Sequence, residues 1–426
     1  MSVGMVSSLT LNTKRFCMGS QSGVKGTQQA VSTPVGDGQD LMGYVQHLLI
    51  DAVNRGASDL HIEPQKDGVR VRQRVNGCFV SAAWIDPHLY PAVLSGIKVM
   101  NGADIAEFRI PQDGRMTLNA GDRRVDVRMS TLPTRFGESV VLRFLDRMRV
   151  GLSMDALGIP EAELGRIRSA LTQPSGIILA TGPTGSGKTT TLYCAIQEIN
   201  RPELKILTVE DPVEYALEGI VQVPVNTAIG LDFASVLRAF LRQDPDVMLI
   251  GEIRDEETAS IGIHAAMTGH RVLSSLHTQD TASAVVRMVD MEIEPFLLAE
   301  TLSGLVGQRL LRRIPGHLKE CYEASDEQRA ALAKDEDQGP LTLCRKAVLK
   351  GPNTKETYDH TFHERIGIFE VMIPNDAIRE CVINKSPGQV IRSIASKNGM
   401  TCLREHARKL VLQGEIEFSE MILQTV

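Results

Sequence analysis

The sequence predicts an α/β protein in which a smaller α+β domain precedes a domain built on a mostly parallel sheet. Three observations lead to this fold class. The 426 residues hold the mass of about three domains of ~150 residues each. Residues 41–148 combine one amphipathic helix pattern with several short strand patterns. From residue 161 onward, apolar strands and helices alternate, which is typical of a parallel sheet with covering helices.

Composition excludes several classes of protein. Apolar residues make up 42% and charged residues 23% of the chain, as in ordinary globular proteins. The 46 Lys and Arg against 52 Asp and Glu give a net charge of −6, whereas a general nucleic-acid binder is usually clearly basic. The seven cysteines are scattered, which fits a reducing cytosol rather than a disulfide framework. No stretch approaches the ~20 apolar residues of a transmembrane helix, so we expect membrane contact only through a partner.

The first domain is expected over residues 41–148. Residues 1–40 before it are rich in Ser, Gly, Thr and Gln without an apolar period, which predicts a flexible tail. Apolar residues recur at helical spacing from Leu41 to Val53, and Gly56 ends this helix. Strand patterns follow in SDLHIEP, GVRVRQRV, RRVDVRMSTL and SVVLRFL, with Asn-Gly as a hairpin turn after the second.

Residues 149–160 are interpreted as a linker and residues 161–426 as the second domain. Its strands and helices alternate in the order GIILAT, TTTLYCAIQEIN, KILTV, DFASVLRAFLRQ, VMLI, EETASIGIHAAMTG, VLSSLH and DTASAVVRMVDM. The acidic stretch at about 315–361 breaks this rhythm and is interpreted as an insertion. Two C-terminal helices follow, with Ser386 predicted as the N-cap of the first and Pro387 in its first turn.

The segment GPTGSGKTT matches the phosphate-binding pattern G-x-x-x-x-G-K-[ST], between a buried strand and a helix. Its glycines allow several backbone N–H groups to converge on one phosphate, aided by the helix N-terminus. Lys188 places a positive charge on the outer phosphates, and Thr189 offers a hydroxyl to Mg²⁺. We therefore expect ATP and Mg²⁺ to bind here, at Gly182, Pro183, Thr184, Gly185, Ser186, Gly187, Lys188, Thr189 and Thr190.

Acidic and histidine side chains follow three further strands. VMLI delivers Glu252 to the carboxyl edge of the sheet, where α/β proteins bind ligands, and we expect it to hold the Mg²⁺ shell or to activate the attacking water. His277 ends the segment VLSSLH, at the catalytic edge, and is expected to sense the γ-phosphate, whereas His270 precedes that strand. Three acids that follow KILTV suggest water polarisation or a cation: Glu210, Asp211 and Glu214.

These segments resemble one family, the hexameric traffic ATPases of type II secretion and type IV pilus assembly. The resemblance runs from about Asp59 to the C-terminus and rests on DLHIEP, RIPQDGR, STLPTRFGESVVLR, GPTGSGKTTTLY, VEDPVEY, LRQDPDVMLIGEIRDEETA, SSLHTQDTASAVVRM and GQRLLRRI. It implies a RecA-like P-loop ATPase domain after a smaller PAS-like domain, assembled as a homo-hexamer. It also implies a cytoplasmic protein, peripheral at the inner face of the bacterial inner membrane, that acts through an inner-membrane platform protein.

The resemblance assigns further roles. The family's acidic box maps to VEDPVE, its histidine box to His270 through His277, and its atypical Walker B motif to LIGE. Arg109, Arg115 and Arg128 of the first domain would reach nucleotide. Apart from Arg254, the second domain offers no arginine that we expect near its P-loop, and NTPases often recruit an arginine from a neighbour. We therefore predict that Arg115 and Arg128 act on nucleotide held by the adjacent subunit.

The sequence departs from the family at its zinc site. Many assembly ATPases carry two C-x-x-C pairs after a helix that bears GQRL. Here that region holds only Cys321 and Cys344, with His317, His360 and His363 nearby. A tetrahedral zinc site needs four ligands, commonly in close pairs, so zinc is not expected.

Two alternatives stay open. The first is a pilus-retraction ATPase of the same family, although the insertion at 315–361 favours the assembly and secretion branch. The second is a RecA-like nucleic-acid motor, which would stack bases on aromatic side chains in a basic groove. Only 4% of residues are aromatic and the second domain is acidic, so we expect no nucleic-acid partner.

Overall fold

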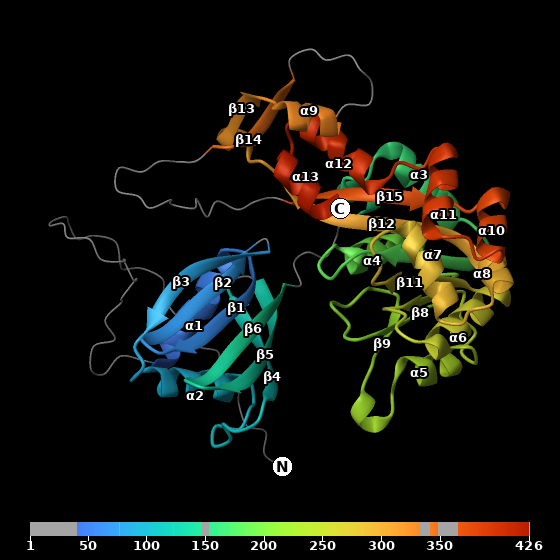
Figure 1. Cartoon of the computed structure of the whole chain (residues 1–426). Helices are drawn as coiled ribbons and strands as arrows, with labels where there is room; N and C mark the ends of the chain where they lie inside the picture. Colours follow the sequence, from blue (N-terminus) through green and yellow to red (C-terminus); the bar gives the residue numbers. More distant parts are fainter. Residues whose placement is uncertain are drawn as a thin grey trace.

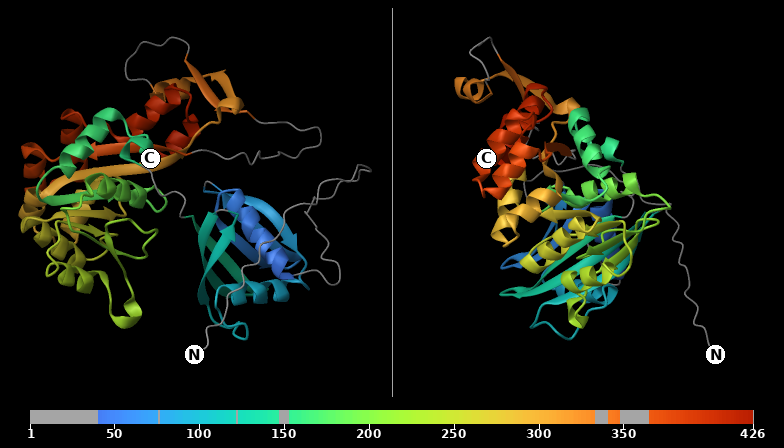
Figure 2. Two further views of the ribbon diagram at one scale, coloured as in Figure 1. Left: turned by 180° about the vertical axis from the view of Figure 1, so that it is seen from behind. Right: turned by 90° about the vertical axis from the view of Figure 1, so that its right-hand side faces the viewer.

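The computed structural model describes residues 41–75, 77–121, 123–146, 153–332, 341–347 and 365–425. The predicted tail at 1–40, the first part of the predicted linker, and His360 and His363 lie outside these residues. Within them, two large sheets form the two domains, which stand beside one another in Figures 1 and 2. An α+β domain thus precedes a RecA-like α/β domain, and the predicted fold class is confirmed.

The first sheet is antiparallel, with strand order β3-β2-β1-β6-β5-β4. Its strands are β1 (Ala57–Gln65), β2 (Gly68–Val75), β3 (Cys78–Ile85), β4 (Gln112–Ala120), β5 (Arg123–Thr134) and β6 (Gly137–Asp146). Helices α1 (Leu41–Asn54) and α2 (Tyr90–Met100) cover one face (Figure 1). Apolar residues from both helices and alternate strand positions, among them Leu49, Ile62, Ile97 and Val127, form the core between them. The predicted strands of this domain therefore all form.

The second sheet has the order β15-β12-β7-β11-β10-β8-β9 and is parallel except for its β12–β15 pair. Its strands are β7 (Gly176–Thr181), β8 (Ile206–Glu210), β9 (Val221–Pro224), β10 (Val247–Ile250), β11 (Arg271–Leu276), β12 (Leu302–Arg312) and β15 (Arg365–Met372). The short helices η2 (Met154–Leu157) and η3 (Thr227–Ile229) lie on loops beside it. The longer helices are α3 (Glu161–Leu171), α4 (Lys188–Ile199), α5 (Phe233–Phe240), α6 (Glu256–Met267), α7 (Thr281–Asp290), α8 (Pro295–Thr301), α10 (Asp376–Ile383), α11 (Gly388–Lys397), α12 (Leu403–Leu412) and α13 (Phe418–Thr425).

Helices cover both faces of this sheet, so its central strands are apolar throughout. Along β7, Ile177 and Leu179 join the core under α5 to α8, whereas Ile178 and Ala180 join the core under α3 and α4. This continuous burial is the reason that the strand GIILAT has no polar alternation. The predicted parallel sheet with covering helices is confirmed.

Two local predictions are wrong. GQRL lies in β12 and not in a helix, because residues 302–307 pair with β7, residues 305–312 pair with β15, and most of the strand is buried. Ser386 does not cap α11: the helix begins at Gly388, and its N-cap is Pro387 with an extended ψ of 146°. The Ser386 N–H donates instead to the carbonyl of Cys381, which closes the end of α10.

The predicted insertion is partly described. After η4 (Gly316–Leu318), strands β13 (Lys319–Glu323) and β14 (Thr342–Lys346) pair antiparallel, and α9 (Asp326–Leu332) lies beside them at one end of the molecule (Figure 1). Leu332 and Leu343 pack in a small core with residues of α12 and α13. The end of β12 is tied to the same helices, since Arg312 donates to Glu420 of α13 at 2.6 and 2.8 Å. No helix of the described residues combines the length and apolarity needed to cross a bilayer.

Candidate nucleotide site

The P-loop connects the carboxyl end of β7 to the start of α4. Gly182 has a φ of +155°, and a Cβ there would lie 2.5 Å from Ser186 Oγ and 2.6 Å from the carbonyl of Gln308. Gly187, the N-cap of α4, has a φ of +91°. Both positions therefore require glycine. The bend that they allow brings the N-terminus of α4 to the phosphate loop.

Lys188 is buried at the first position of α4. Its Nζ donates to the carbonyls of Gly182 at 2.9 Å and Pro183 at 3.2 Å. Burial lowers the pKa of Lys188 below its ordinary value; the charge of Arg309 lowers it further, and that of Glu252 opposes the shift. A dianionic phosphate group would offset this burial of positive charge.

Two buried polar atoms at the loop have no hydrogen-bond partner within the described residues: Ser186 Oγ and Gln308 Oε1. Gln308 comes from β12, and its Nε2 donates to the backbone carbonyl of Ser186 at 2.6 Å. Buried polar atoms are normally satisfied, and the Ser186 hydroxyl can donate, so its position beside Lys188 indicates an acceptor ligand. Gln308 Oε1 only accepts and would not bond to a phosphate oxygen. The residues present thus fit a phosphate group.

Glu252 lies just beyond β10, the strand between β8 and β11. His277 Nε2 is 2.9 Å from its Oε2, and the guanidinium of Arg254 donates to its Oε1. The carboxylate is 12% exposed, and it acts electrostatically on Lys188. The structure therefore brings together Glu252, His277 and Lys188, which the sequence places on three separate motifs.

Two serines of β11 fix the loop that carries Glu252. Ser274 Oγ donates to the carbonyl of Ile250 and Ser275 Oγ to that of Gly251, each at 2.8 Å. The Ile253 N–H in turn donates to the carbonyl of Ser275 at 3.0 Å. These hydrogen bonds were not predicted from the sequence. Two adjacent serines inside a buried strand indicate that their hydroxyls bond to neighbouring backbone.

The two histidines of the predicted histidine box lie at opposite ends of β11. His270 precedes the strand, and its Nδ1 is 3.0 Å from the carbonyl of Ala265 at the end of α6. His277 follows the strand at the carboxyl edge, where the P-loop lies. Only His277 is therefore part of the site.

Glu210 is held inside the protein by three donors. The hydroxyls of Tyr193 and Thr208 and the Nε2 of Gln222 all donate to its carboxylate. Burial, with Glu210 beside it, raises the pKa of Tyr193 well above its ordinary value. Because the Glu210 carboxylate already accepts these hydrogen bonds, it anchors the acidic loop. Glu252 is therefore better placed than Glu210 to receive a proton from water.

One arginine of the first domain, Arg128, interacts electrostatically with acidic residues of the second domain. Arg115 and Arg128 lie opposite one another on β4 and β5. Burial is the main cause that lowers the pKa of Arg128, and the charges of Glu214 and Asp211 oppose that shift. The structure thus places Arg128 near the acidic loop after β8.

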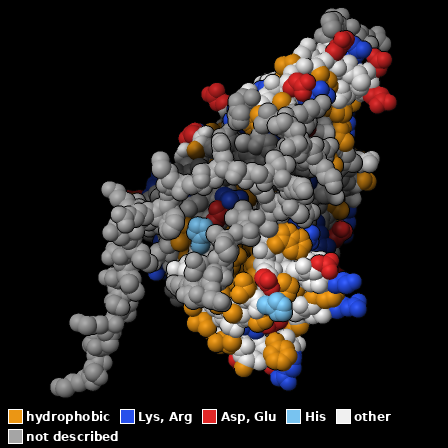
Figure 3. Space-filling model, turned by 90° about the vertical axis from the view of Figure 1, so that its left-hand side faces the viewer, with side chains coloured by type: hydrophobic (Ala, Val, Ile, Leu, Met, Phe, Trp, Pro, Cys, Tyr) orange, Lys and Arg blue, Asp and Glu red, His pale blue; other side chains and the backbone are white. Residues whose placement is uncertain are grey.

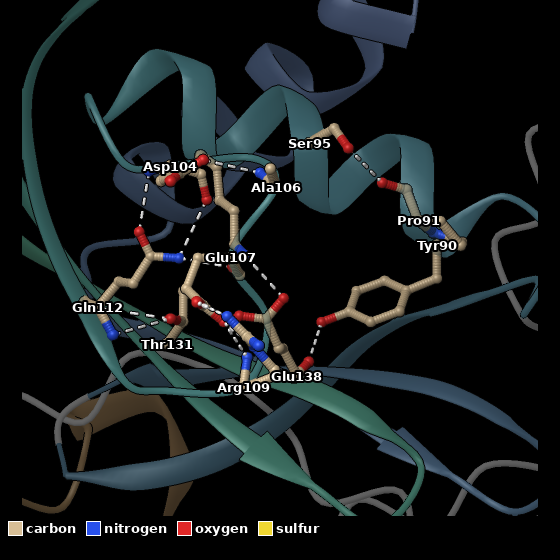
Figure 4. Close-up of polar contacts among 11 residues, drawn as sticks. Tyr90, Pro91, Ser95, Asp104, Ala106, Glu107, Arg109, Gln112, Thr131 and Glu138 are labelled. Carbon is tan, nitrogen blue, oxygen red and sulfur yellow. Dashed lines mark hydrogen bonds and ion pairs between the residues drawn. The ribbon is translucent and has the colours of Figure 1, made fainter.

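Arg109 projects from the loop between α2 and β4. Glu107 accepts from its guanidinium at 2.7 and 3.1 Å and from its backbone N–H at 2.7 Å, which lowers the pKa of Glu107 to about 2. Gln112 Nε2 donates to the carbonyls of Asp104 at 3.0 Å and Glu107 at 2.8 Å, so the loop is cross-linked by its own side chains (Figure 4). Arg109 is 77% exposed, beside the exposed apolar Phe108. Glu107 therefore fixes the orientation of the Arg109 side chain, which bonds to its own loop and not to the P-loop of the second domain.

The expectation that the second domain has no other arginine near its P-loop is wrong. Arg309 on β12 is 9% exposed, and its charge acts on Lys188. Its guanidinium donates to the carbonyls of Gln279 at 2.5 Å and Gln308 at 3.1 Å. Because GQRL forms a strand and not a helix, Arg309 comes to lie beside the phosphate loop.

The parallel sheet, the glycine loop and the acid at the carboxyl edge define a RecA-like protein with a phosphate site. Residues 36–423 match the family described as Type II/IV secretion system protein, and the chain belongs to this family. It is 43% identical to the Type II secretion system protein E of Xanthomonas campestris pv. campestris, over 89% of this chain and 66% of that protein. It is 41% identical to the Type IV pilus assembly ATPase PilB of Myxococcus xanthus, over 91% of this chain and 68% of that protein.

A solved structure shares the fold. The Pilus Retraction Motor PilT with bound ADP is similar to this chain with a TM-score of 0.60 and 24% identity, over 89% of this chain and 96% of that protein. The chain spans about two thirds of the length of its Xanthomonas and Myxococcus relatives, so their full length contains residues without a counterpart here.

Proposed function

We propose that this protein is an ATP-hydrolysing motor that powers type II protein secretion or type IV pilus assembly. One observation carries the proposal: Glu252 is held between His277 and Arg254 at the carboxyl edge of the sheet, within electrostatic reach of the P-loop Lys188. The identities above 40% to a secretion protein and a pilus assembly ATPase support the same activity.

The chemistry of hydrolysis divides among named residues. The P-loop backbone from Gly182 to Thr190 and the Lys188 ammonium hold the β- and γ-phosphates of ATP. The Thr189 hydroxyl and Glu252 are the protein groups suited to a Mg²⁺ ion, which neutralises charge on the phosphates when it is bound. Glu252 accepts a proton from the attacking water, and His277 keeps the carboxylate oriented.

The assembly is proposed to be a homo-hexamer, in which Arg115 and Arg128 of one subunit reach nucleotide on the next. Within one chain, Arg128 interacts electrostatically with Asp211 and Glu214 of the acidic loop after β8. This interaction supports a position of Arg128 beside the nucleotide site. Arg109, oriented by Glu107 on an exposed loop, is placed to contact a neighbour. The domain limits that we propose are 41–148 and 161–426, joined by a linker at 149–160 and preceded by a flexible tail.

The partner is proposed to be an inner-membrane platform protein, with the motor cytoplasmic and peripheral at the inner face of the membrane. We expect no nucleic-acid partner, and membrane contact only through that protein. The apolar residues Ile105, Phe108 and Ile110 of the first domain are exposed. The face of the molecule drawn in Figure 3 carries hydrophobic side chains together with charges of both signs.

Phosphate release from ATP by the purified chain tests the proposal. The wild-type protein is expected to hydrolyse ATP with Mg²⁺, and Lys188→Ala is expected to abolish hydrolysis because it removes the charge at the outer phosphates. Affinity capture from bacterial membranes should recover an inner-membrane protein. Stimulation of hydrolysis by single-stranded DNA at moderate salt, without an effect of the captured protein, would favour a nucleic-acid motor instead.

A further inference from the structure

Two cysteines face one another across the hairpin of the insertion. Cys321 on β13 and Cys344 on β14 are directly paired in the antiparallel register, and their Sγ atoms are 3.4 Å apart. Opposed residues of antiparallel strands have Cα atoms about 4.5–5.5 Å apart, within the range of about 4.4–6.8 Å found in disulfides. Rotation of the side chains alone can therefore close the gap to a bond.

Both thiols can be reached from solvent. Cys321 is exposed and Cys344 is partly exposed, whereas Cys194 and Cys381 are buried. Burial raises the pKa of Cys194 to about 11, which leaves it a protonated and unreactive thiol at neutral pH. Burial and the neighbouring Cys321 also raise the pKa of Cys344. Cys321 is the more exposed thiol of the pair, so a small molecule in solution reaches it first.

The strands around the pair hold this register. Next to it, Arg345 donates to Glu320 across the hairpin at 3.0 and 3.2 Å and lies over the ring of Tyr322. Gly414, in the turn between α12 and α13, approaches so closely that a Cβ there would lie 2.8 Å from Cys344 Sγ. The thiols therefore stay opposed, with the backbone of the C-terminal helices packed against one of them.

We propose that Cys321 and Cys344 form a redox-active dithiol that closes to a disulfide between β13 and β14 by exchange with a low-molecular-weight disulfide. The Cys321 thiolate attacks one sulfur of that molecule, forms a mixed disulfide and releases one thiol. The Cys344 thiolate then attacks Cys321 Sγ, forms the protein disulfide and releases the second thiol. The two electrons and two protons lost by the protein are gained by the small disulfide.

The pair shares no residue with the nucleotide site. Within the described residues, no group of three or more His, Cys, Asp or Glu side chains is arranged to hold a metal ion. Among these residues, the pair therefore has no further side chains that would complete a tetrahedral zinc site. Two thiols in contact are suited to oxidation. The oxidised form would lock β13 to β14 beside α12 and α13.

Titration of the full-length chain with mixtures of oxidised and reduced glutathione tests the proposal. After iodoacetamide trapping, peptide mass spectrometry is expected to show Cys321 and Cys344 lose alkylation together, as one cross-linked peptide lighter by two hydrogens. The matched variant Cys402→Ser should keep this transition unchanged. Cys321→Ser should abolish the cross-link and leave Cys344 either alkylated or as a glutathione adduct.

Three outcomes would overturn the inference. The first is independent alkylation of both thiols at every redox ratio. The second is accumulation of the Cys321 glutathione adduct without closure. The third is one zinc atom per chain by elemental analysis that is lost in Cys344→Ser, since the pair would then be a metal ligand. Circular dichroism of each variant shows whether the chain is folded, so a folding defect cannot be mistaken for lost reactivity.

Discussion

His277 Nε2 lies 2.9 Å from Glu252 Oε2, and this contact joins the ends of two adjacent parallel strands. The other carboxylate oxygen accepts from Arg254, so Glu252 is held from both sides. Its orientation is thus fixed before any water reacts, which lowers the reorganisation needed for proton transfer. The first prediction follows from this arrangement.

Glu252→Gln is expected to retain ATP binding and to lose at least about 100-fold in turnover, because an amide cannot take up the proton of water. Equilibrium binding of ATP and steady-state phosphate release measure the two effects separately. Glu256→Gln, on the exposed first turn of α6, is the matched control and should behave as wild type. Near-normal turnover of Glu252→Gln would show that Glu252 is not the base and would make Glu210 the better candidate.

Gln308→Leu is expected to weaken ATP binding and to lower the free energy of unfolding by about 1–3 kcal/mol, because the buried carbonyl of Ser186 loses its donor. Chemical denaturation and ATP titration give the two values. Gln413→Leu, at an exposed helix end, should change neither. Unchanged ATP affinity in Gln308→Leu would show that β12 does not support the phosphate loop.

Lys98→Met is expected to destabilise the first domain by about 3–5 kcal/mol. Lys98 and Glu138 form an ion pair of 2.7 Å with side chains 1% and 5% exposed, so loss of the lysine leaves a buried carboxylate without its counter-ion. The double variant Lys98→Met/Glu138→Leu should recover most of the loss in urea denaturation. Arg109→Met removes an exposed partner of Glu107 and should have little effect. A double variant as unstable as Lys98→Met would contradict the ion-pair explanation.

Chains with Arg115→Ala/Arg128→Ala and chains with Lys188→Ala are each expected to be inactive, and mixing them should restore part of the hydrolysis. One interface of a mixed ring then combines an intact P-loop with intact arginines from the neighbour. Phosphate release is measured on mixtures whose mixed assembly is shown by differential labelling. If mixed rings form without regaining activity, Arg115 and Arg128 do not act between subunits.

The sequence predicted much of the fold because its periodicity is strong. GIILAT, KILTV and VMLI are short apolar runs bounded by turns, and all three form strands in the parallel part of one sheet. The resemblance placed GQRL on a helix, and the sequence could not correct this, because a short apolar run has no period that separates a buried strand from a helix. Its pairing with β7, more than a hundred residues earlier in the chain, decides the outcome.

The candidate site was predictable only where a motif carries it. Lys188 and Glu252 belong to recognisable motifs, and the rule that parallel strands end at one edge brings them together. Arg309 could not be placed, because its position depends on β12 lying next to β7. The opposition of Cys321 and Cys344 depends on the register of a hairpin whose strands are separated by about twenty residues, and no local pattern fixes that register.

Strand β12 touches the phosphate loop at Gln308 and helix α13 at Arg312. The four residue steps from Gln308 to Arg312 span about 13 Å of extended chain. Residues 308–312 are hydrogen-bonded to β15, so this part of the strand resists stretching. The phosphate loop and helix α13 are therefore held at a fixed spacing along β12.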